Sequence, residues 1–115
     1  MAKNKKLKKA HFIGICGTGM STLAVMLKEA GWQVSGSAED FFEPIPSYLK
    51  KNEIHFNKKF AKKNIPKDVN LIVVGNSALL SLEVNPETKH ALESRYKIKS
   101  LPQALAELSE KKENK

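Results

Sequence analysis

The chain alternates between short, continuous apolar runs and longer stretches in which apolar residues recur at helical spacing. Residues 11–15 form the first run and residues 70–75 the clearest β-branched one. Runs that are apolar on both faces are typical of strands buried in a parallel sheet. Shorter runs predict three further strands, at residues 32–36, 54–56 and 96–99.

Helical periodicity begins directly after the first strand. Apolar residues follow the i, i+3, i+4, i+7 pattern of one helix face, and Gly31 supplies the stop. The apolar positions are Met20, Leu23, Ala24, Leu27 and Ala30. The first strand, this helix and the second strand therefore predict one parallel strand–helix–strand unit with a right-handed crossover.

Turn and capping residues divide the second half of the chain. Prolines make residues 39–46 a loop, followed by a short helix at 46–51 whose inward residues are Ile45, Leu49 and Tyr48. The charged stretch 57–64 predicts a loop with one helical turn.

Two further helices have recognisable start signals. Asn85-Pro86 combines a good N-cap with a residue favoured at the first helical position. Ser100 and Gln103 have the spacing of a capping box. The buried stripe predicted for the last helix is Leu101, Ala104, Leu105 and Leu108, with fraying from residue 109.

Alternating strands and helices predict an α/β fold, an open parallel sheet of about five strands with helices on both faces. The length of 115 residues suits one domain. We place this domain at residues 11–110, between flexible tails at 1–10 and 111–115.

Composition excludes several classes of protein. The apolar fraction is 41% and no run of about 18 apolar residues occurs, so no membrane span is predicted. The lysine-rich N-terminus lacks the apolar region of a secretory signal. The single cysteine, Cys16, excludes an internal disulfide framework and fits a reducing, cytoplasmic setting.

The net charge of +8 raises the question of nucleic-acid binding. The lysines, however, gather at both ends and at residues 58–63, and Arg95 is the only arginine. Since basic and aromatic residues are not interleaved, we interpret the lysines as solvated tails and one basic face, with no nucleic-acid partner.

The loop between the first strand and its helix carries the candidate chemistry. Residues 17–22 give G-x-G-x-x-T, an imperfect form of the dinucleotide-binding fingerprint. The first amides of a helix lack internal acceptors and lie at its positive end, and glycines let an anion approach them. The hydroxyls of Thr18 and Ser21 suit phosphate oxygens, whereas Thr22 at the third glycine position predicts slightly looser packing or a helix set further from the strand. A sharp turn without a ligand is the alternative.

Polar residues follow two other strands. Glu39 and Asp40 lie about 20 residues beyond the loop, where an acid often binds a ribose hydroxyl. Asn76 and Ser77 follow the 70–75 strand, so they should reach the same crevice at the carboxyl edge. Solvated-loop and turn roles are the alternatives.

Other chemistry finds little support in the sequence. The histidines, His11, His55 and His90, are dispersed and lack nearby carboxylate or thiol partners, so we predict no metal site, with His11 at a strand entrance. We interpret Cys16 as a small buried hydrophobe in preference to a reactive thiol. The chain contains neither a convincing nucleophile–base pair nor a G-x-x-x-x-G-K-[S/T] loop.

Four spaced motifs, at residues 11–21, 34–37, 74–78 and 85–87, resemble the N-terminal domain of the Mur ligases. The closest types are the UDP-N-acetylmuramate–L-alanine ligases and the murein-peptide recycling ligases. The resemblance covers about residues 10–110 and implies a Rossmann-like domain that binds UDP-N-acetylmuramate instead of NAD.

The resemblance also implies roles for particular residues. The diphosphate would contact Gly17, Thr18, Gly19, Met20 and Ser21. The uridine or ribose would lie near Ser37 and a following acid, and the other side would be lined by Asn76, Ser77 and Ala78. The chain departs from the family pattern at Thr22, where glycine is usual, and at Ala38, where an acid is common, so either Glu39 or Asp40 would take the acid's place.

Complete Mur ligases add a central ATP-binding domain and a C-terminal domain. By this resemblance we expect the chain to bind substrate without catalysis, with ATP and magnesium used only by a full-length ligase. The chain would be either an excised domain or a free-standing relative. Two alternatives remain open: an NAD(P)-binding redox or sensor domain, and a regulatory or assembly module that uses Leu79, Leu80 and Leu82.

Overall fold

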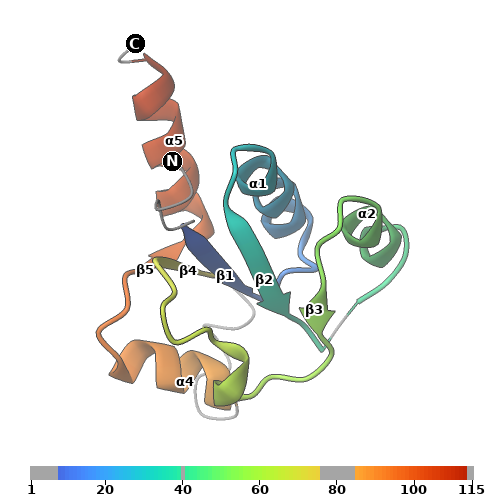
Figure 1. Ribbon diagram of the computed structural model, residues 1–115, viewed down its shortest axis with the longest axis vertical. Helices are drawn as coiled ribbons and strands as arrows, with labels where there is room; N and C mark the ends of the chain where they lie inside the picture. Colours follow the sequence, from blue (N-terminus) through green and yellow to red (C-terminus); the bar gives the residue numbers. More distant parts are fainter. Residues whose placement is uncertain (1–7, 40, 76–84, 114–115) are drawn as a thin grey trace, which may run out of the picture.

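The computed structural model describes residues 8–39, 41–75 and 85–113. All strands are parallel and form one five-stranded sheet in the order β3-β2-β1-β4-β5 (Figure 1). This confirms the predicted sheet. The strands are β1 (Lys9–Ile13), β2 (Gln33–Ser37), β3 (Phe56–Asn57), β4 (Leu71–Val74) and β5 (Ile98–Ser100).

Helices cover both faces of the sheet, as predicted. One face carries α1 (Thr18–Glu29), α2 (Ile45–Lys51) and α5 (Leu101–Glu113). The other face carries α4 (Pro86–Glu93) and the 3₁₀ turn η2 (Lys62–Asn64). None of the described helices is long and apolar enough to cross a membrane.

The side chains of β1 supply both halves of the core. Phe12 packs with the cluster under α1, which contains Leu23 and Leu49. Ile13 packs with the cluster under α4, which contains Ile72 and Ala91. Because β1 is the middle strand, both of its faces are covered, which explains its continuous apolar run.

Three local signals in the sequence have their expected structural roles. Gly31 follows α1 with φ +102°, the left-handed conformation of a helix stop. Asn85 caps α4, since its side chain accepts hydrogen bonds from the backbone of Glu87 and Thr88, both at 3.1 Å. Ser100 and Gln103 form the reciprocal capping box of α5.

Element boundaries differ from the prediction where backbone geometry decides them. β1 begins at Lys9, inside the predicted N-terminal tail, and ends at Ile13 because Gly14 has φ +88° and turns the chain. α1 starts at Thr18, two residues before the first apolar position of its stripe. α5 continues to Glu113, past the predicted start of fraying.

Two residues predicted to lie inward are instead exposed. Tyr48 is 39% exposed, and the inward position of its helix is taken by Leu49. Leu105 is 41% exposed because α5 extends past the edge of the sheet, leaving the packing to Leu101 and Ala104 (Figure 1).

Gly36 permits a close approach of β2 to the segment that follows β1. A Cβ at Gly36 would lie 2.6 Å from Cδ1 and 2.8 Å from Cβ of Ile15, and 2.9 Å from the carbonyl oxygen of Phe12. Contacts this short would force the backbone apart, since one of them is to a backbone atom. Gly36 therefore sets the spacing between β2 and the glycine loop.

We predict that Gly36→Ala lowers the free energy of unfolding by about 1–3 kcal/mol through overpacking. Gly75→Ala is the matched control, because the nearest atom to its Cβ would be 3.6 Å away, an ordinary contact. Urea denaturation of both variants measures the difference. Equal losses in the two variants would contradict this role of Gly36.

Candidate functional site

The glycine loop presents the first turn of α1 at the carboxyl edge of the sheet. Gly17 is the N-cap of α1, with no side-chain cap, and its amide donates to the carbonyl of Gly14 at 3.1 Å. The bond from the Ser21 amide to the Gly17 carbonyl, at 2.8 Å, is the first turn of helical hydrogen bonding. The three preceding amides, at residues 18–20, therefore have no acceptor within the helix and can bind an anion.

The glycines of this loop have different roles from those that the fingerprint suggested. Gly14, with φ +88°, makes the tight turn. Gly19 lies within α1, where a Cβ would be 2.6 Å from Cδ2 of Leu101, so it allows α5 to pack closely. Thr22 is exposed on α1. It does not lie between helix and strand, and the prediction that it sets the helix further from the strand is wrong.

Two of the predicted phosphate contacts have buried side chains. Met20 and Ser21 are each 3% exposed. Met20 packs under the loop, with Cγ 3.4 Å from where a Cβ on Gly17 would be and 3.6 Å from the same point on Gly75. Gly17 is exposed and Gly19 is partly exposed.

The other predicted binding residues differ in exposure, and several of them lie outside the described residues. Ser37 ends β2 and its side chain is fully buried. Glu39 is exposed, and its carboxylate accepts a hydrogen bond from the amide of Phe60 at 3.2 Å. The remaining candidates lie outside the described residues: Asp40, Asn76, Ser77, Ala78 and the predicted contact leucines Leu79, Leu80 and Leu82.

The segment that carries Asn76 starts beside the glycine loop. The amide of Gly75 donates to the carbonyl of Ile13 at 3.0 Å, which joins the end of β4 to the end of β1. The strand order changes direction here, with β2 on one side of β1 and β4 on the other. Ligands of open parallel sheets bind at such switch points.

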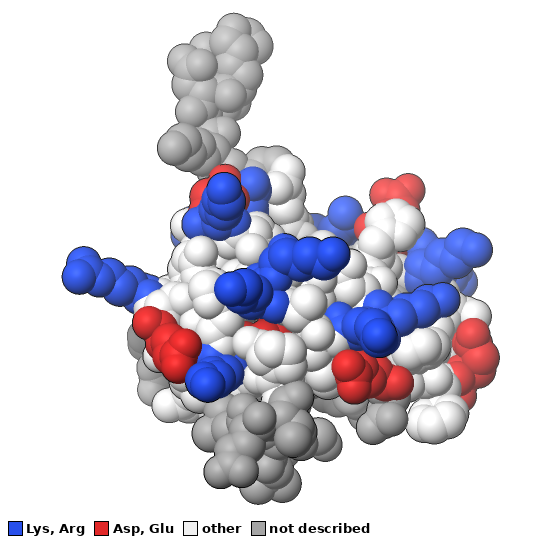
Figure 2. Space-filling model, turned by 90° about the horizontal axis from the view of Figure 1, so that it is seen from below, with Lys and Arg blue, Asp and Glu red and all other residues white. Residues whose placement is uncertain are grey.

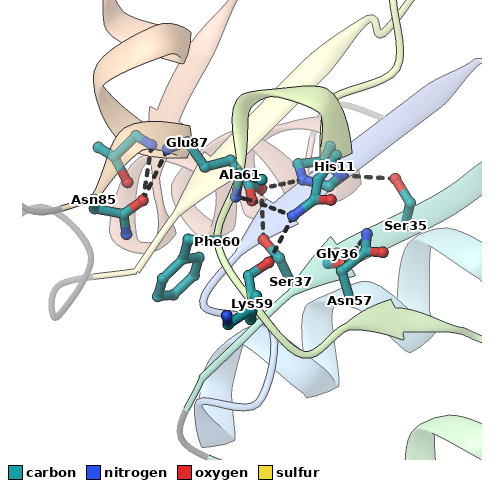
Figure 3. A network of polar contacts seen from close by, with 12 residues as sticks. His11, Ser35, Gly36, Ser37, Asn57, Lys59, Phe60, Ala61, Asn85 and Glu87 are labelled. Atoms are coloured by element: carbon teal, nitrogen blue, oxygen red, sulfur yellow. Dashed lines mark hydrogen bonds and ion pairs between the residues drawn. The ribbon is translucent and has the colours of Figure 1, made fainter.

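A buried polar network that no local sequence pattern indicates lies on the α4 side of this edge (Figure 3). Glu87 is fully buried, and its Oε2 accepts from Nε2 of His11 and from Oγ of Ser37, both at 2.5 Å. Its Oε1 accepts from the amide of Ala61 at 3.0 Å and from Nδ2 of Asn64 at 2.7 Å.

His11 differs most from its predicted role. It lies in the middle of β1, fully buried, with Nδ1 2.7 Å from Oγ of Ser35. The prediction that it sits at a strand entrance without a carboxylate partner is wrong. The partner, Glu87, is 76 residues away in the sequence, and only the polar residue within an apolar strand could have drawn attention to it.

The hydrogen bonds decide the charge state of this carboxylate. Burial acts to raise the pKa of Glu87. The hydrogen bonds from His11 and Ser37, the charge interaction with His11 and the bond from Ala61 outweigh it, so the pKa lies below the ordinary value of 4.5. Glu87 is therefore a buried carboxylate at neutral pH.

The remaining candidate groups do not form a reactive centre. Cys16 is buried, and burial raises the pKa of its thiol, in agreement with a packing role. Within the described ranges, no group of three or more His, Cys, Asp or Glu side chains could hold a metal ion.

The edge of the sheet where the strands end is rich in basic side chains. Figure 2 looks onto this side of the molecule and shows Lys and Arg spread across it with acidic residues between them. The stretch that follows β3 and includes η2 contributes four exposed lysines, namely Lys58, Lys59, Lys62 and Lys63. Beside β3, a cavity of about 520 Å³ has Phe41, Phe56 and Lys58 in its lining.

We predict that acid weakens the contribution of Glu87 to stability. Because its pKa is lower in the folded chain than in the unfolded chain, that contribution is complete above about pH 4.5 and is lost as the pH falls through the folded-state pKa. Urea denaturation of the wild type and Glu87→Gln between neutral pH and about pH 3 should show a stability difference that narrows below pH 4.5. A difference that stays constant over this range would contradict the prediction.

Comparison with known proteins identifies the family to which this chain belongs. The family model described as "Mur ligase family, catalytic domain" matches residues 9–113. The UDP-N-acetylmuramate–L-alanine ligase of Streptococcus mutans is 38% identical over 100 residues, covering 87% of this chain and 21% of that protein. The UDP-N-acetylmuramate–L-alanyl-γ-D-glutamyl-meso-2,6-diaminoheptandioate ligase of Haemophilus influenzae is 29% identical over 99 residues, covering 86% and 21%.

Solved structures agree with these sequence matches. The UDP-N-acetylmuramate–alanine ligase of Thermotoga maritima superimposes with a TM-score of 0.78 at 26% identity, covering 90% of this chain and 23% of that one. The chain thus spans about a fifth of the length of the curated relatives it matches. Since the family model matches nearly the whole chain and the Rossmann-like fold agrees, this chain belongs to the Mur ligase family and corresponds to its N-terminal domain.

Proposed function

We propose that this chain binds UDP-N-acetylmuramate and holds its diphosphate on the first turn of α1. The observation that carries the proposal is the set of three amides, at residues 18–20, that precede the first helical hydrogen bond at a glycine N-cap. These donors lie at the switch point of the sheet, beside the start of the segment that contains Asn76. The relatives named above are ligases of UDP-N-acetylmuramate, which supplies the identity of the ligand.

The site we propose uses backbone groups more than side chains. Gly17 is exposed and has no Cβ, so a phosphate can approach the amides that follow it. The basic face that Figure 2 shows would raise the local concentration of a dianionic diphosphate. We assign the ribose to the neighbourhood of Ser37 and of Glu39 or Asp40, and the opposite wall to Asn76, Ser77 and Ala78.

We further propose that this binding serves an ATP-dependent ligase that builds cell-wall peptides, with catalysis outside this domain. The sequence contains no G-x-x-x-x-G-K-[S/T] loop, so the ATP and magnesium of such a ligase would bind elsewhere. We assign no cofactor to the domain itself. Its partners would be the UDP-sugar and the other ligase domains.

We predict that UDP-N-acetylmuramate raises the melting temperature of the wild type and that Gly17→Asp abolishes this effect. At a ligand concentration of 100 Kd, mass action stabilises the folded state by about 2.7 kcal/mol. An aspartate N-cap should leave the free protein at least as stable, since it caps the helix and complements its dipole. Its carboxylate would repel the diphosphate.

The matched control is Gly17→Ala, which adds only a methyl group at an ordinary contact distance, 3.4 Å from Cγ of Met20. This variant should keep most of the ligand-induced shift in differential scanning fluorimetry. NAD, titrated in parallel, should give no shift. An undiminished response of Gly17→Asp to UDP-N-acetylmuramate would remove the loop from the site, and no response of the folded wild type would refute the proposed function.

A further inference from the structure

The carboxylate of Glu87 joins segments that are far apart in the sequence. Its two oxygens accept four hydrogen bonds: Oε2 from His11 and Ser37, and Oε1 from Ala61 and Asn64 (Figure 3). The donors belong to β1, to β2, and to η2 with its N-cap residue Ala61, and Glu87 itself lies in the first turn of α4. Glu87 has no exposed surface, so this carboxylate is shielded from solvent.

Ser37 links this network to the glycine loop. Its hydroxyl donates to Glu87 at 2.5 Å, while its backbone carbonyl accepts from the amides of Gly14 at 2.8 Å and Ile15 at 3.0 Å. The side chain of Ser37 is thus held by the Glu87 carboxylate, and its backbone carbonyl is held by the glycine loop. The carbonyl of Gly14 then holds the amide of Gly17, the N-cap of α1, at 3.1 Å.

This series of contacts leads from a buried carboxylate to the amides of the proposed binding site. The links from Glu87 to Gly14 join residues that are buried or partly buried, and the last link reaches Gly17, which is exposed. A buried polar group that loses its hydrogen-bond partner is costly. Without the Glu87 carboxylate, the side chain of Ser37 should therefore adopt another conformation in which its hydroxyl is paired. A shift of Ser37 would also move its backbone carbonyl, to which the Gly14 and Ile15 amides of the glycine loop are bonded.

We propose that Glu87 is a positioning residue for the nucleoside diphosphate. It fixes the end of β2, and through Ser37 the glycine loop, in the geometry that directs the first-turn amides of α1 at the ligand. Glu87 does not touch the ligand. This inference rests on the proposed function for its ligand, but its structural part, the hold of Glu87 on the loop, can be measured without any ligand.

The test variant is Glu87→Met, which keeps the length of the side chain but has no carboxylate oxygen. His11 and Ser37 therefore lose the acceptor that Oε2 provides, and Ala61 and Asn64 lose Oε1. We expect the Kd for uridine diphosphate, measured by calorimetry, to rise at least tenfold. We also expect the amides of Gly14 and Ile15 to exchange with solvent at least tenfold faster.

Two controls separate positioning from general loss of stability. Asn64→Ala removes a donor to Oε1 only, leaving the bond between Oε2 and Ser37. Val69→Ala creates a cavity in the α4-side core, in the connection that precedes β4 and thus at the opposite edge of the sheet. In both variants we expect the Kd and the exchange of the two loop amides to stay within about threefold of the wild type.

The outcomes distinguish this inference from the proposed function. If the wild type binds uridine diphosphate and Glu87→Met binds it equally well, the positioning role is overturned. Equal losses in Glu87→Met and Val69→Ala would overturn it too, because destabilisation alone would then explain them. If the wild type binds no nucleotide, the proposed function fails, and unchanged exchange at Gly14 and Ile15 in Glu87→Met would refute the hold on the loop independently.

Should Glu87→Met fail to fold, Ser37→Ala tests the same link. It removes the hydroxyl that reaches Glu87 and keeps the backbone carbonyl that accepts from the loop. Faster exchange of the Gly14 and Ile15 amides in this variant supports the inference, and wild-type exchange contradicts it.

Discussion

The carboxyl edge of this sheet depends on one buried carboxylate. Moving an ionised carboxylate from water into a protein interior costs several kcal/mol unless hydrogen bonds and charge replace its hydration. At Glu87 four donors meet that need, and despite complete burial the hydrogen bonds from His11, Ser37 and Ala61, with the charge of His11, hold its pKa below the ordinary value. Because each donor comes from the strands or the η2 region while Glu87 lies on α4, satisfying this charge fixes where those elements lie.

The two faces of the sheet contribute differently to the proposed site. The face under α1 and α5 is an apolar cluster that supports the glycine loop from below, with Met20 packed against the loop. The face under α4 combines an apolar cluster with the Glu87 network. Ser37 connects the two, since its side chain belongs to the network and its carbonyl to the loop. The loop is therefore held from both sides before any ligand binds.

The glycines show how one motif can serve several physical needs. Gly14 supplies a backbone conformation with positive φ, and Gly17 an open N-cap. Gly19 and Gly36 instead make room for side chains of other elements, Leu101 and Ile15. Only Gly17 and the amides after it bear directly on the anion that we propose. Spacing in the sequence locates such a loop, but it does not separate ligand contacts from packing contacts.

The sequence by itself determined the structural features whose interacting residues lie close together along the chain. Periodicity predicted the order of strands and helices, and local hydrogen-bonding chemistry predicted the Asn85 cap, the stop at Gly31 and the box of Ser100 with Gln103. These predictions are confirmed because the interacting residues lie within four residues of one another.

Only the tertiary structure decided the features that join distant segments. The bond between His11 and Glu87 spans 76 residues, so no local pattern predicts it. The exposure of Thr22, the packing of Gly19 on Leu101 and the burial of the Ser37 hydroxyl likewise depend on which elements meet. A side chain's partners across the sheet are set by the fold, because residues far apart in the sequence become neighbours only when the strands have paired.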